Sequence, residues 1–173
     1  MSKTVELMES IYDDNDRIAA RVNAGLEQKG IYAVNVMGTP GAGKTSCLMQ
    51  IIKRLKGLKP YVIEGDIQSD IDTKKLTDVG VETIQINTGG ACHLDGTVIE
   101  NTLSKFEFDE KGILFIENIG NLVCPAEFEI GEHIKLLVSS VAEGSDKPYK
   151  YPLAFEKAAV ILVNKVDLLP HLD

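Results

Sequence analysis

The stretch that decides the fold is residues 31–45, IYAVNVMGTPGAGKT. Ile31–Met37 combines β-branched, aromatic and apolar residues, which predicts a buried strand. Residues 38–45 follow at once and match the pattern G-x-x-x-x-G-K-[ST], and helical spacing resumes over residues 47–58. A strand, a glycine-rich turn and a helix in this order favour a phosphate-binding loop over the alternative, a tight turn carrying a surface lysine.

Each residue type in this loop has a physical reason. Gly41 and Gly43 let backbone N–H groups converge on phosphate oxygens, and the following helix N-terminus adds a favourable dipole. Lys44 would bring a positive charge to the β- and γ-phosphates, and the Thr45 hydroxyl suits Mg²⁺. The residues expected to bind the nucleotide phosphates are Gly38, Gly41, Ala42, Gly43, Lys44, Thr45 and Ser46.

Strands and helices alternate along the rest of the chain. Apolar residues at helical spacing from Val5 to Gln28, with Gly30 next, predict an N-terminal amphipathic helix within residues 1–30. Helical patterns also cover residues 70–79 and 95–106. This alternation predicts a three-layer α/β P-loop NTPase fold with a mainly parallel sheet. Further strands are expected at residues 61–63, 81–86, 113–117, 134–140 and 158–164.

Length and charge narrow the function. A chain of 173 residues predicts one P-loop domain over 1–173. The net charge of −8 argues against nucleic acid or an anionic membrane as the main partner, because no surplus of positive charge exists to neutralise phosphates. No apolar run approaches the ~18 residues that span a bilayer, and no secretory leader is evident, so we expect a cytoplasmic protein.

A second motif, NKVD at residues 164–167, follows the last predicted strand. Asp167 can accept hydrogen bonds from the N1 and N2 donors of guanine, which adenine lacks. Taken alone, the motif could be a helix cap and turn. Placed after the last strand of a P-loop protein, it favours guanine, with Asn164, Lys165 and Asp167 as binding residues and GTP or GDP as ligand.

Acidic residues follow two other predicted strands. Asp66 and Asp72 come after the second strand, and Glu117 comes at the end of ILFIE, three residues before Gly120. Carboxylates at such strand ends face the nucleotide crevice, where, with Lys44, they can orient Mg²⁺ or the attacking water. Gly120 can offer a backbone N–H to the γ-phosphate. The alternative for the two aspartates is helix capping.

Arginine usage separates the enzyme classes. The sequence has only Arg17, Arg21 and Arg54, so no arginine follows the first predicted helix after the phosphate loop. Small-molecule kinases of this fold clamp the transferred phosphoryl group with lid arginines, which makes an ATP-dependent kinase the weaker alternative. An arginine finger is worth about 10³ to 10⁵ in rate, so we expect slow intrinsic GTP hydrolysis, as in a switch.

The third signal is a set of metal-binding residues. Cys92 and His93 follow the predicted strand VETIQI, and Cys124 follows Gly120, so we expect adjacent parallel strands to bring the three together. Two thiolates and one imidazole suit Zn²⁺ or Ni²⁺ and leave one coordination position open. The alternatives are buried structural cysteines or a closed structural zinc in a docking module. Residues expected only to pack or to lie at the surface are Cys47, His133 and His171.

Taken together, GTPGAGKT, the GDI around Asp66, TGGACHLD, FIENIGNLVCP and NKVD resemble the HypB family of hydrogenase maturation GTPases. The resemblance implies a SIMIBI-type GTPase that forms a GTP-dependent homodimer and binds nickel or zinc through Cys92, His93 and Cys124 at the interface. It also implies Mg²⁺, held by Thr45, Asp66, Asp72 and Glu117, a HypA-type nickel chaperone, and the large subunit of [NiFe] hydrogenase as client. The urease accessory GTPases are the alternative, although their Cys-Pro-His motif fits this pattern poorly.

Three expectations follow from the order of these motifs. Residues 117–120 would sense the γ-phosphate and Cys124 would respond within the same loop, changing metal affinity with nucleotide state. Lys147 and Lys150 could reach phosphate across a dimer, or simply form a solvated loop. Because the sequence ends at Asp173, shortly after Asp167, we expect a complete domain to continue through a further strand and a loop behind the guanine.

Overall fold

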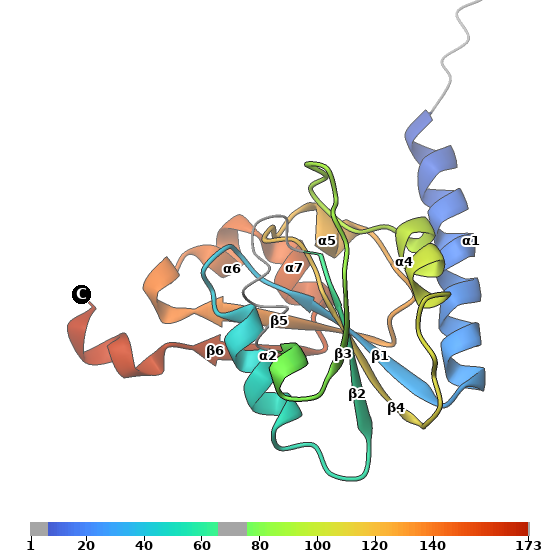
Figure 1. Cartoon of the computed structure of the whole chain (residues 1–173). Helices are drawn as coiled ribbons and strands as arrows, with labels where there is room; N and C mark the ends of the chain where they lie inside the picture. Colours follow the sequence, from blue (N-terminus) through green and yellow to red (C-terminus); the bar gives the residue numbers. More distant parts are fainter. Residues whose placement is uncertain (1–6, 66–75, 173) are drawn as a thin grey trace, which may run out of the picture.

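The computed structural model describes residues 7–65 and 76–172 and contains a six-stranded parallel sheet in the order β3-β2-β4-β1-β5-β6 (Figure 1). β1, the phosphate-loop strand, lies between β4 and β5 near the centre. The carboxyl ends of the strands therefore meet at one edge of the sheet, as the alternating pattern predicts. The strands are β1 Ile31–Met37, β2 Lys59–Glu64, β3 Glu82–Gln85, β4 Gly112–Glu117, β5 Ile134–Ser140 and β6 Val160–Asn164.

Helices cover both faces of this sheet. In Figure 1, α1 and α4 lie together on one side and α2 lies on the other. The described α-helices are α1 Leu7–Gln28, α2 Lys44–Ile52, α4 Gly96–Leu103, α5 Cys124–Glu127, α6 Lys147–Lys150 and α7 Pro152–Lys157, and the 3-10 helices are η1 Val141–Glu143 and η2 Val166–His171. No helix within the described ranges is both long enough and apolar enough to cross a bilayer.

The alternation of side chains along each strand builds two cores. In β1, Ile31 and Ala33 pack with α1 and α4, whereas Val34 and Val36 pack with α2. Nearly every residue of β1 is buried, which is the pattern of a parallel strand covered on both faces. The predicted three-layer architecture is therefore confirmed.

Several predicted boundaries were wrong. α2 covers Lys44–Ile52 rather than residues 47–58, because Gly43 ends the loop in a left-handed conformation and the residues after Ile52 are mostly charged. The helix predicted at residues 95–106 ends at Leu103, and the last strand begins at Val160 rather than residue 158. The helix predicted at residues 70–79 lies largely outside the described residues.

The short helices α5, α6 and α7 were not predicted from the sequence. Each is one or two turns long and carries a proline at its first or second position, Pro125, Pro148 and Pro152 respectively. Proline suits this position because its missing N–H would have no intrahelical partner there. Helices this short show too little periodicity to be recognised from apolar spacing.

α1 is fixed to the rest of the domain by polar side chains as well as by its apolar face. Asn15 Nδ2 donates to the Glu129 carbonyl at 2.7 Å, and Asn15 Oδ1 accepts from the Gly96 N–H at 2.9 Å. Close packing occurs at Gly131, where φ is 97° and a Cβ would lie 2.2 Å from Cγ1 of Val22. The helix therefore holds together two segments, 93–96 and 128–132, that are distant in sequence.

Gly131→Ala tests this docking of α1. Alanine there must adopt a left-handed backbone and also displace Val22, so we expect the free energy of unfolding to fall by about 3 kcal/mol or more. The matched control is Gly57→Ala, which has φ of 73° but open space around a Cβ, and should cost about 1 kcal/mol. Urea unfolding measures both, and equal losses would show that α1 does not press on Gly131.

Candidate functional site

The phosphate loop lies between β1 and α2 with the geometry of an anion site. Gly41 and Gly43 have φ of 75° and 97°, a region that glycine adopts without strain. The Lys44 side chain is only 5% exposed, and its Nζ donates to the carbonyls of Gly38 and Thr39 at 3.4 and 3.5 Å. The ammonium group is thus folded over the loop, where phosphate oxygens can replace these weak carbonyl contacts.

Residues of the NKVD motif contact this loop directly. Asn164 Nδ2 donates to the Ala42 carbonyl at 2.8 Å, and Lys165 Nζ donates to the Gly41 carbonyl at 2.6 Å. A Cβ on Gly43 would lie only 2.2 Å from Asn164 Nδ2. Asn164 and Lys165, expected to bind guanine, therefore brace the loop in this structure, while the Asp167 side chain is exposed to solvent in η2.

Glu117 and Thr45 form the end of the loop where Mg²⁺ is expected. Glu117 is 2% exposed, and its Oε1 accepts a hydrogen bond from Thr45 Oγ1 at 2.9 Å. Glu64, which sequence analysis missed, is also buried and is the register partner of Glu117 across β2 and β4. The Glu117 carboxylate and the Thr45 hydroxyl offer the oxygen donors that a hard cation prefers, and Glu64 adds a second buried carboxylate on the neighbouring strand.

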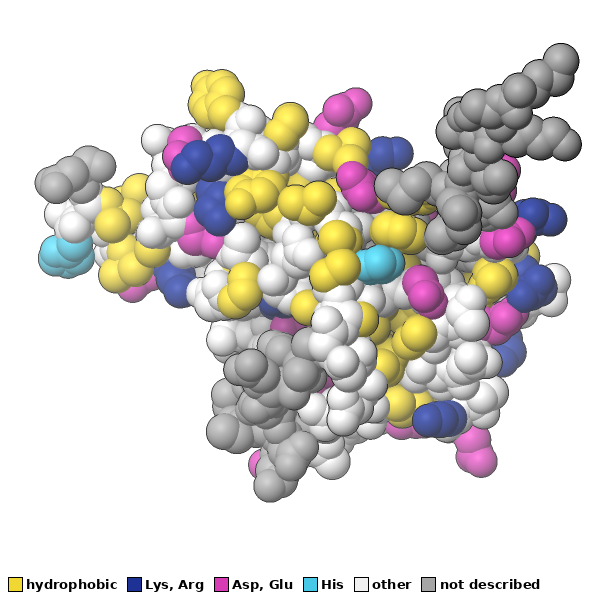
Figure 2. Space-filling model, turned by 90° about the horizontal axis from the view of Figure 1, so that it is seen from above, with side chains coloured by type: hydrophobic (Ala, Val, Ile, Leu, Met, Phe, Trp, Pro, Cys, Tyr) yellow, Lys and Arg dark blue, Asp and Glu magenta, His cyan; other side chains and the backbone are white. Residues whose placement is uncertain are grey.

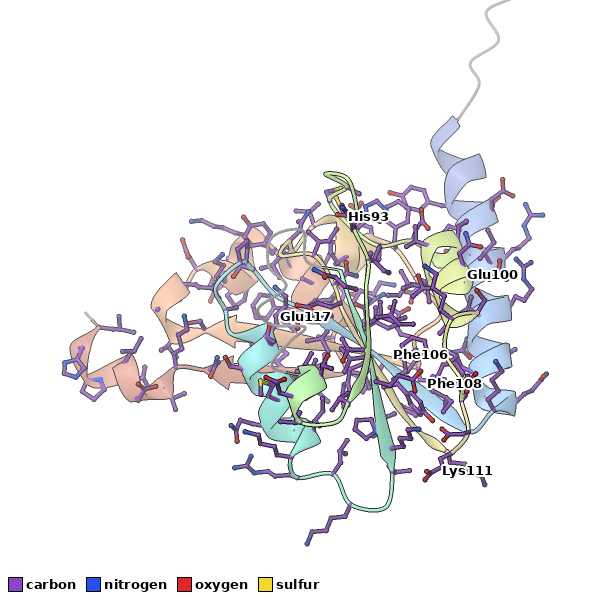
Figure 3. The ribbon with its side chains drawn as sticks, viewed as in Figure 1. His93, Glu100, Phe106, Phe108, Lys111 and Glu117 are labelled. Carbon is purple, nitrogen blue, oxygen red and sulfur yellow. The ribbon has the colours of Figure 1, made fainter. Side chains whose placement is uncertain are left out.

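The other two predicted Mg²⁺ ligands, Asp66 and Asp72, lie outside the described residues. Glu64 could have been found from the sequence, because it is an acidic residue at the end of the apolar run YVI, as Glu117 is after ILFI. Figure 3 shows Glu117 at the carboxyl end of β4, beside the start of α2, with His93 on the loop above. The oxygen atoms of Thr45 and Glu117 fit a bound Mg²⁺ ion.

The segment after Glu117 lies on the phosphate loop. A Cβ on Gly120 would be 2.7 Å from Cγ and 2.9 Å from N of Pro40, so only glycine allows this approach. Next to it, Asn121 forms an isolated antiparallel bridge with Gly38. The structure therefore places residues 117–121 against the loop expected to hold the phosphates.

Cys92, His93 and Cys124 come together as a cluster. Cys92 Sγ lies 3.1 Å from Cys124 Sγ and 3.3 Å from His93 Nδ1, and all three ligand atoms lie within 4.8 Å of one another. Metal–ligand bonds of about 2.0 to 2.3 Å would fit inside this set. Cys92 is exposed, whereas His93 and Cys124 are half-buried, so one side of the cluster is open to an incoming ligand.

The expected reason for this convergence was wrong. The strands that precede the ligands, β3 and β4, are not neighbours, because β2 lies between them. Asparagine side chains join the two loops instead: Asn121 Nδ2 donates to the Cys92 carbonyl at 3.2 Å, and Asn118 Oδ1 accepts from the Leu94 N–H at 3.3 Å. These asparagines stand in the quoted FIENIGNLVCP segment, but their function depends on the neighbouring loop.

Aromatic rings connect the cluster to α1. The Phe128 ring stacks on His93 with centroids 4.0 Å apart, and Tyr12 of α1 stacks on the other side of Phe128 at 4.9 Å. The Tyr12 hydroxyl donates to Glu127 Oε2 at 3.3 Å. Sequence analysis assigned neither ring to the site, because residues 12 and 128 are far apart in the chain.

The surroundings of the ligands set their protonation. Burial lowers the pKa of His93, although Asp95 and Glu127 oppose this shift, so the imidazole favours the neutral form that binds metals. The hydrogen bond with Cys92, together with burial, raises the pKa of the Cys124 thiol. A metal ion must therefore displace the Cys124 proton, and its apparent affinity rises with pH.

The remaining predicted residues behave as ordinary packing or surface groups. Cys47 packs against the core on the α2 side, where burial raises the pKa of its thiol. His133 Nδ1 accepts the Ala33 N–H at 2.9 Å, and its ring stacks on Tyr32. His171 lies exposed in η2. Lys147 and Lys150 form ion pairs within their own segment, with Glu143 at 3.6 Å and Asp146 at 2.5 Å.

Fold and site geometry together define a P-loop protein of the SIMIBI class with a Cys/His cluster beside the segment that lies on its phosphate loop. The chain belongs to the CobW/HypB/UreG family: the model of that nucleotide-binding domain matches residues 32–173. It is 46% identical to the hydrogenase maturation factor HypB of Azotobacter vinelandii, over 99% of this chain and 57% of that protein.

Two solved HypB structures are similar to this chain in both fold and sequence. HypB from Archaeoglobus fulgidus matches with a TM-score of 0.85 and 38% identity, over 92% of this chain and 78% of that chain. HypB from Helicobacter pylori in complex with nickel matches with a TM-score of 0.86 and 36% identity, over 91% and 75% respectively. The chain spans a little over half the length of the first curated relatives that it matches.

A double-mutant cycle tests whether Asn164 braces the phosphate loop. Gly43→Ala should weaken binding of a fluorescent GDP analogue at least tenfold (about 1.4 kcal/mol), because the new Cβ displaces the Asn164 amide. In an Asn164→Ala background that clash is gone and only the strain of alanine at φ 97° remains, so the same substitution should cost about threefold less in affinity. Equal costs in both backgrounds would show that the two residues act independently.

Proposed function

We propose that this chain is a GTP-hydrolysing metallochaperone domain, which couples nucleotide-dependent dimerisation to nickel insertion during hydrogenase maturation. The observation that carries the proposal is the position of one short segment. Glu117 contacts Thr45 of the phosphate loop at its start, and Cys124 contacts Cys92 at its end. A change at the nucleotide can therefore reach the metal cluster through a few residues of backbone.

At the nucleotide, each expected interaction has a candidate residue. Lys44 would neutralise charge on the β- and γ-phosphates, and Asp167 would select guanine from solvent-exposed η2. Thr45 and Glu117 would hold Mg²⁺, with Asp66 and Asp72 proposed as further ligands or water-positioning groups. The bound Mg²⁺ would withdraw charge from the phosphates, and Gly120 would offer its N–H to the γ-phosphate.

At the other end of the segment, nickel or zinc is the cargo. Two thiolates and a neutral imidazole bind borderline metals tightly, and a fourth position left open permits transfer to an acceptor. The relative from Helicobacter pylori crystallised with nickel supports nickel as one such ion. A closed structural zinc is less consistent with the exposed Cys92.

Nucleotide-dependent dimerisation is the remaining part of the proposed function. Figure 2 shows hydrophobic side chains spread across the face seen from above, with a histidine among them. A partner chain bound there in the GTP state would cover apolar surface and add ligands to the metal. The proposed partner is a HypA-type nickel chaperone and the proposed client is the large subunit of [NiFe] hydrogenase, all in the cytoplasm.

Removing single sulfurs tests the metal site. Cys92→Ala and Cys124→Ala should each reduce the affinity for Ni²⁺ or Zn²⁺ at least a hundredfold, which corresponds to ~2.7 kcal/mol for the lost ligand. The affinity for GDP should change less than twofold. Cys47→Ala is the matched control and should bind metal like the unmodified chain, because Cys47 packs in the core. Loss of GDP binding in both ligand variants would identify these cysteines as structural instead.

Nucleotide dependence tests the coupling itself. The Ni²⁺ dissociation constant should differ about fivefold or more between GDP and a non-hydrolysable GTP analogue, because a ligand shifts only an equilibrium whose states it binds unequally. The oligomeric mass, measured by light scattering in the same samples, should double with the GTP analogue. Identical metal affinity and identical mass in both states would refute the proposal.

A further inference from the structure

Two polar side chains interrupt the apolar face of the sheet that α1 and α4 cover. Asn35 lies at the centre of β1 and Lys135 near the start of β5, and the two are register partners. Asn35 is 0% exposed and the Lys135 side chain only 4%. Their sequence neighbours on the same face, such as Ala33 and Leu137, are apolar. The side-chain hydrogen bonds of both residues go to groups outside the phosphate loop, and sequence analysis gave neither residue a function.

These side chains belong to a continuous chain of buried hydrogen bonds. Lys135 Nζ forms an ion pair with Glu132 Oε1, whose side chain is 2% exposed. Asn35 Nδ2 donates to the same Glu132 oxygen at 2.9 Å. Asn118 Nδ2 in turn donates to Asn35 Oδ1 at 3.1 Å. The chain therefore runs from Lys135 through Glu132 and Asn35 to Asn118.

Both ends of this chain reach the neighbours of His93. At one end, Asn118 Oδ1 accepts from the N–H of Leu94, the residue after His93. At the other end, Lys135 Nζ donates to the carbonyl of Phe128 at 3.0 Å, and the Phe128 ring stacks on the imidazole. The backbone of His93 and the ring that faces it are thus held by one network.

The same network begins beside the nucleotide site. Asn118 directly follows Glu117, which accepts from the Thr45 hydroxyl, and Asn118 Oδ1 also accepts from the Ile119 N–H at 2.9 Å. Any shift of residues 117–119 that accompanies a change of nucleotide must move the Asn118 amide. That amide contacts Leu94 and Asn35 together, so the shift is passed on by both routes.

Energetics argue that this network has a use besides stability. Removing an ion pair such as Lys135–Glu132 from water costs several kcal/mol per ion, and well-packed apolar residues at such positions are often as stable or more so. Fully satisfied buried networks instead specify one geometry. The geometry specified here is the position of His93 relative to Cys92 and Cys124.

We propose that Asn35, Glu132 and Lys135 are positioning residues that relay the state of the Glu117 segment to His93 through Asn118 and Phe128. The inference rests on the proposed function, in which nucleotide state changes metal affinity. It adds a second route, through the sheet, to the direct route along residues 117–124. His93 would respond to the second route and Cys124 to the first.

The test uses two variants that keep all three ligands. Glu132→Leu with Lys135→Met replaces the ion pair by apolar side chains, and Asn35→Leu removes the middle of the network. Ni²⁺ is titrated with GDP or with a non-hydrolysable GTP analogue, using the sulfur-to-nickel charge-transfer absorption. We expect each variant to bind Ni²⁺, with the ratio of the two dissociation constants falling to about half of its value in the unmodified chain, because the direct route to Cys124 remains.

The control is Lys59→Met, which removes the Lys59–Asp109 ion pair, 2.6 Å long, at the amino end of β2 and should keep the ratio of the unmodified chain. The relay is refuted if a variant has the melting temperature of the unmodified chain and also keeps its ratio of Ni²⁺ dissociation constants. Asn35→Leu serves as the decisive variant if the double substitution does not fold. A ratio of one in the unmodified chain would instead refute the proposed coupling itself, and the relay with it.

Discussion

The hydrogen bond from Thr45 to Glu117 is the contact on which the rest of the site depends. It joins the first turn of α2 to the end of β4, two elements that the sheet brings together although they are distant in sequence. Glu117 is buried beside Glu64, so the position of its carboxylate depends on the charge of whatever group binds next to it. The segment from Gly120 to Cys124 follows Glu117 in the chain, so the position of the Cys/His cluster depends on the position of the phosphate loop.

The N-terminal helix is part of the site rather than only a cover for the sheet. Asn15 bonds to Gly96 and Glu129, which follow the two cysteine-bearing loops, and Tyr12 stacks on Phe128, the ring that stacks on His93. Such contacts hold a surface cluster in place without burying it, since the ligands remain half-buried or exposed. An open but preorganised cluster is consistent with the proposed transfer of a metal ion.

Local patterns were strong where chemistry is local. The strand Ile31–Met37 and the following loop were identified correctly because the glycine positions and apolar run are contiguous. The three candidate metal ligands were also selected from residue types and spacing, and the structure brings their ligand atoms within 4.8 Å of one another. Sequence analysis missed Asn118, Asn121 and Phe128, because each contacts a partner on another segment. It also missed Glu64, although this residue ends an apolar run as Glu117 does. The start of α2 was misplaced because it is set by the left-handed backbone conformation of Gly43, which apolar spacing does not reveal.

Residue order alone settled the kind of fold, the phosphate loop and the donor atoms available to a metal, since these depend on short-range periodicity and side-chain chemistry. Folding in three dimensions settled how the sites connect. The strand order places β2 between β3 and β4, the strands that precede the two cysteine-bearing loops, so asparagine side chains rather than strand pairing join these loops. It also puts Asn35 beside Lys135 in the interior, where a polar network persists only because every member finds a partner that the linear pattern does not reveal.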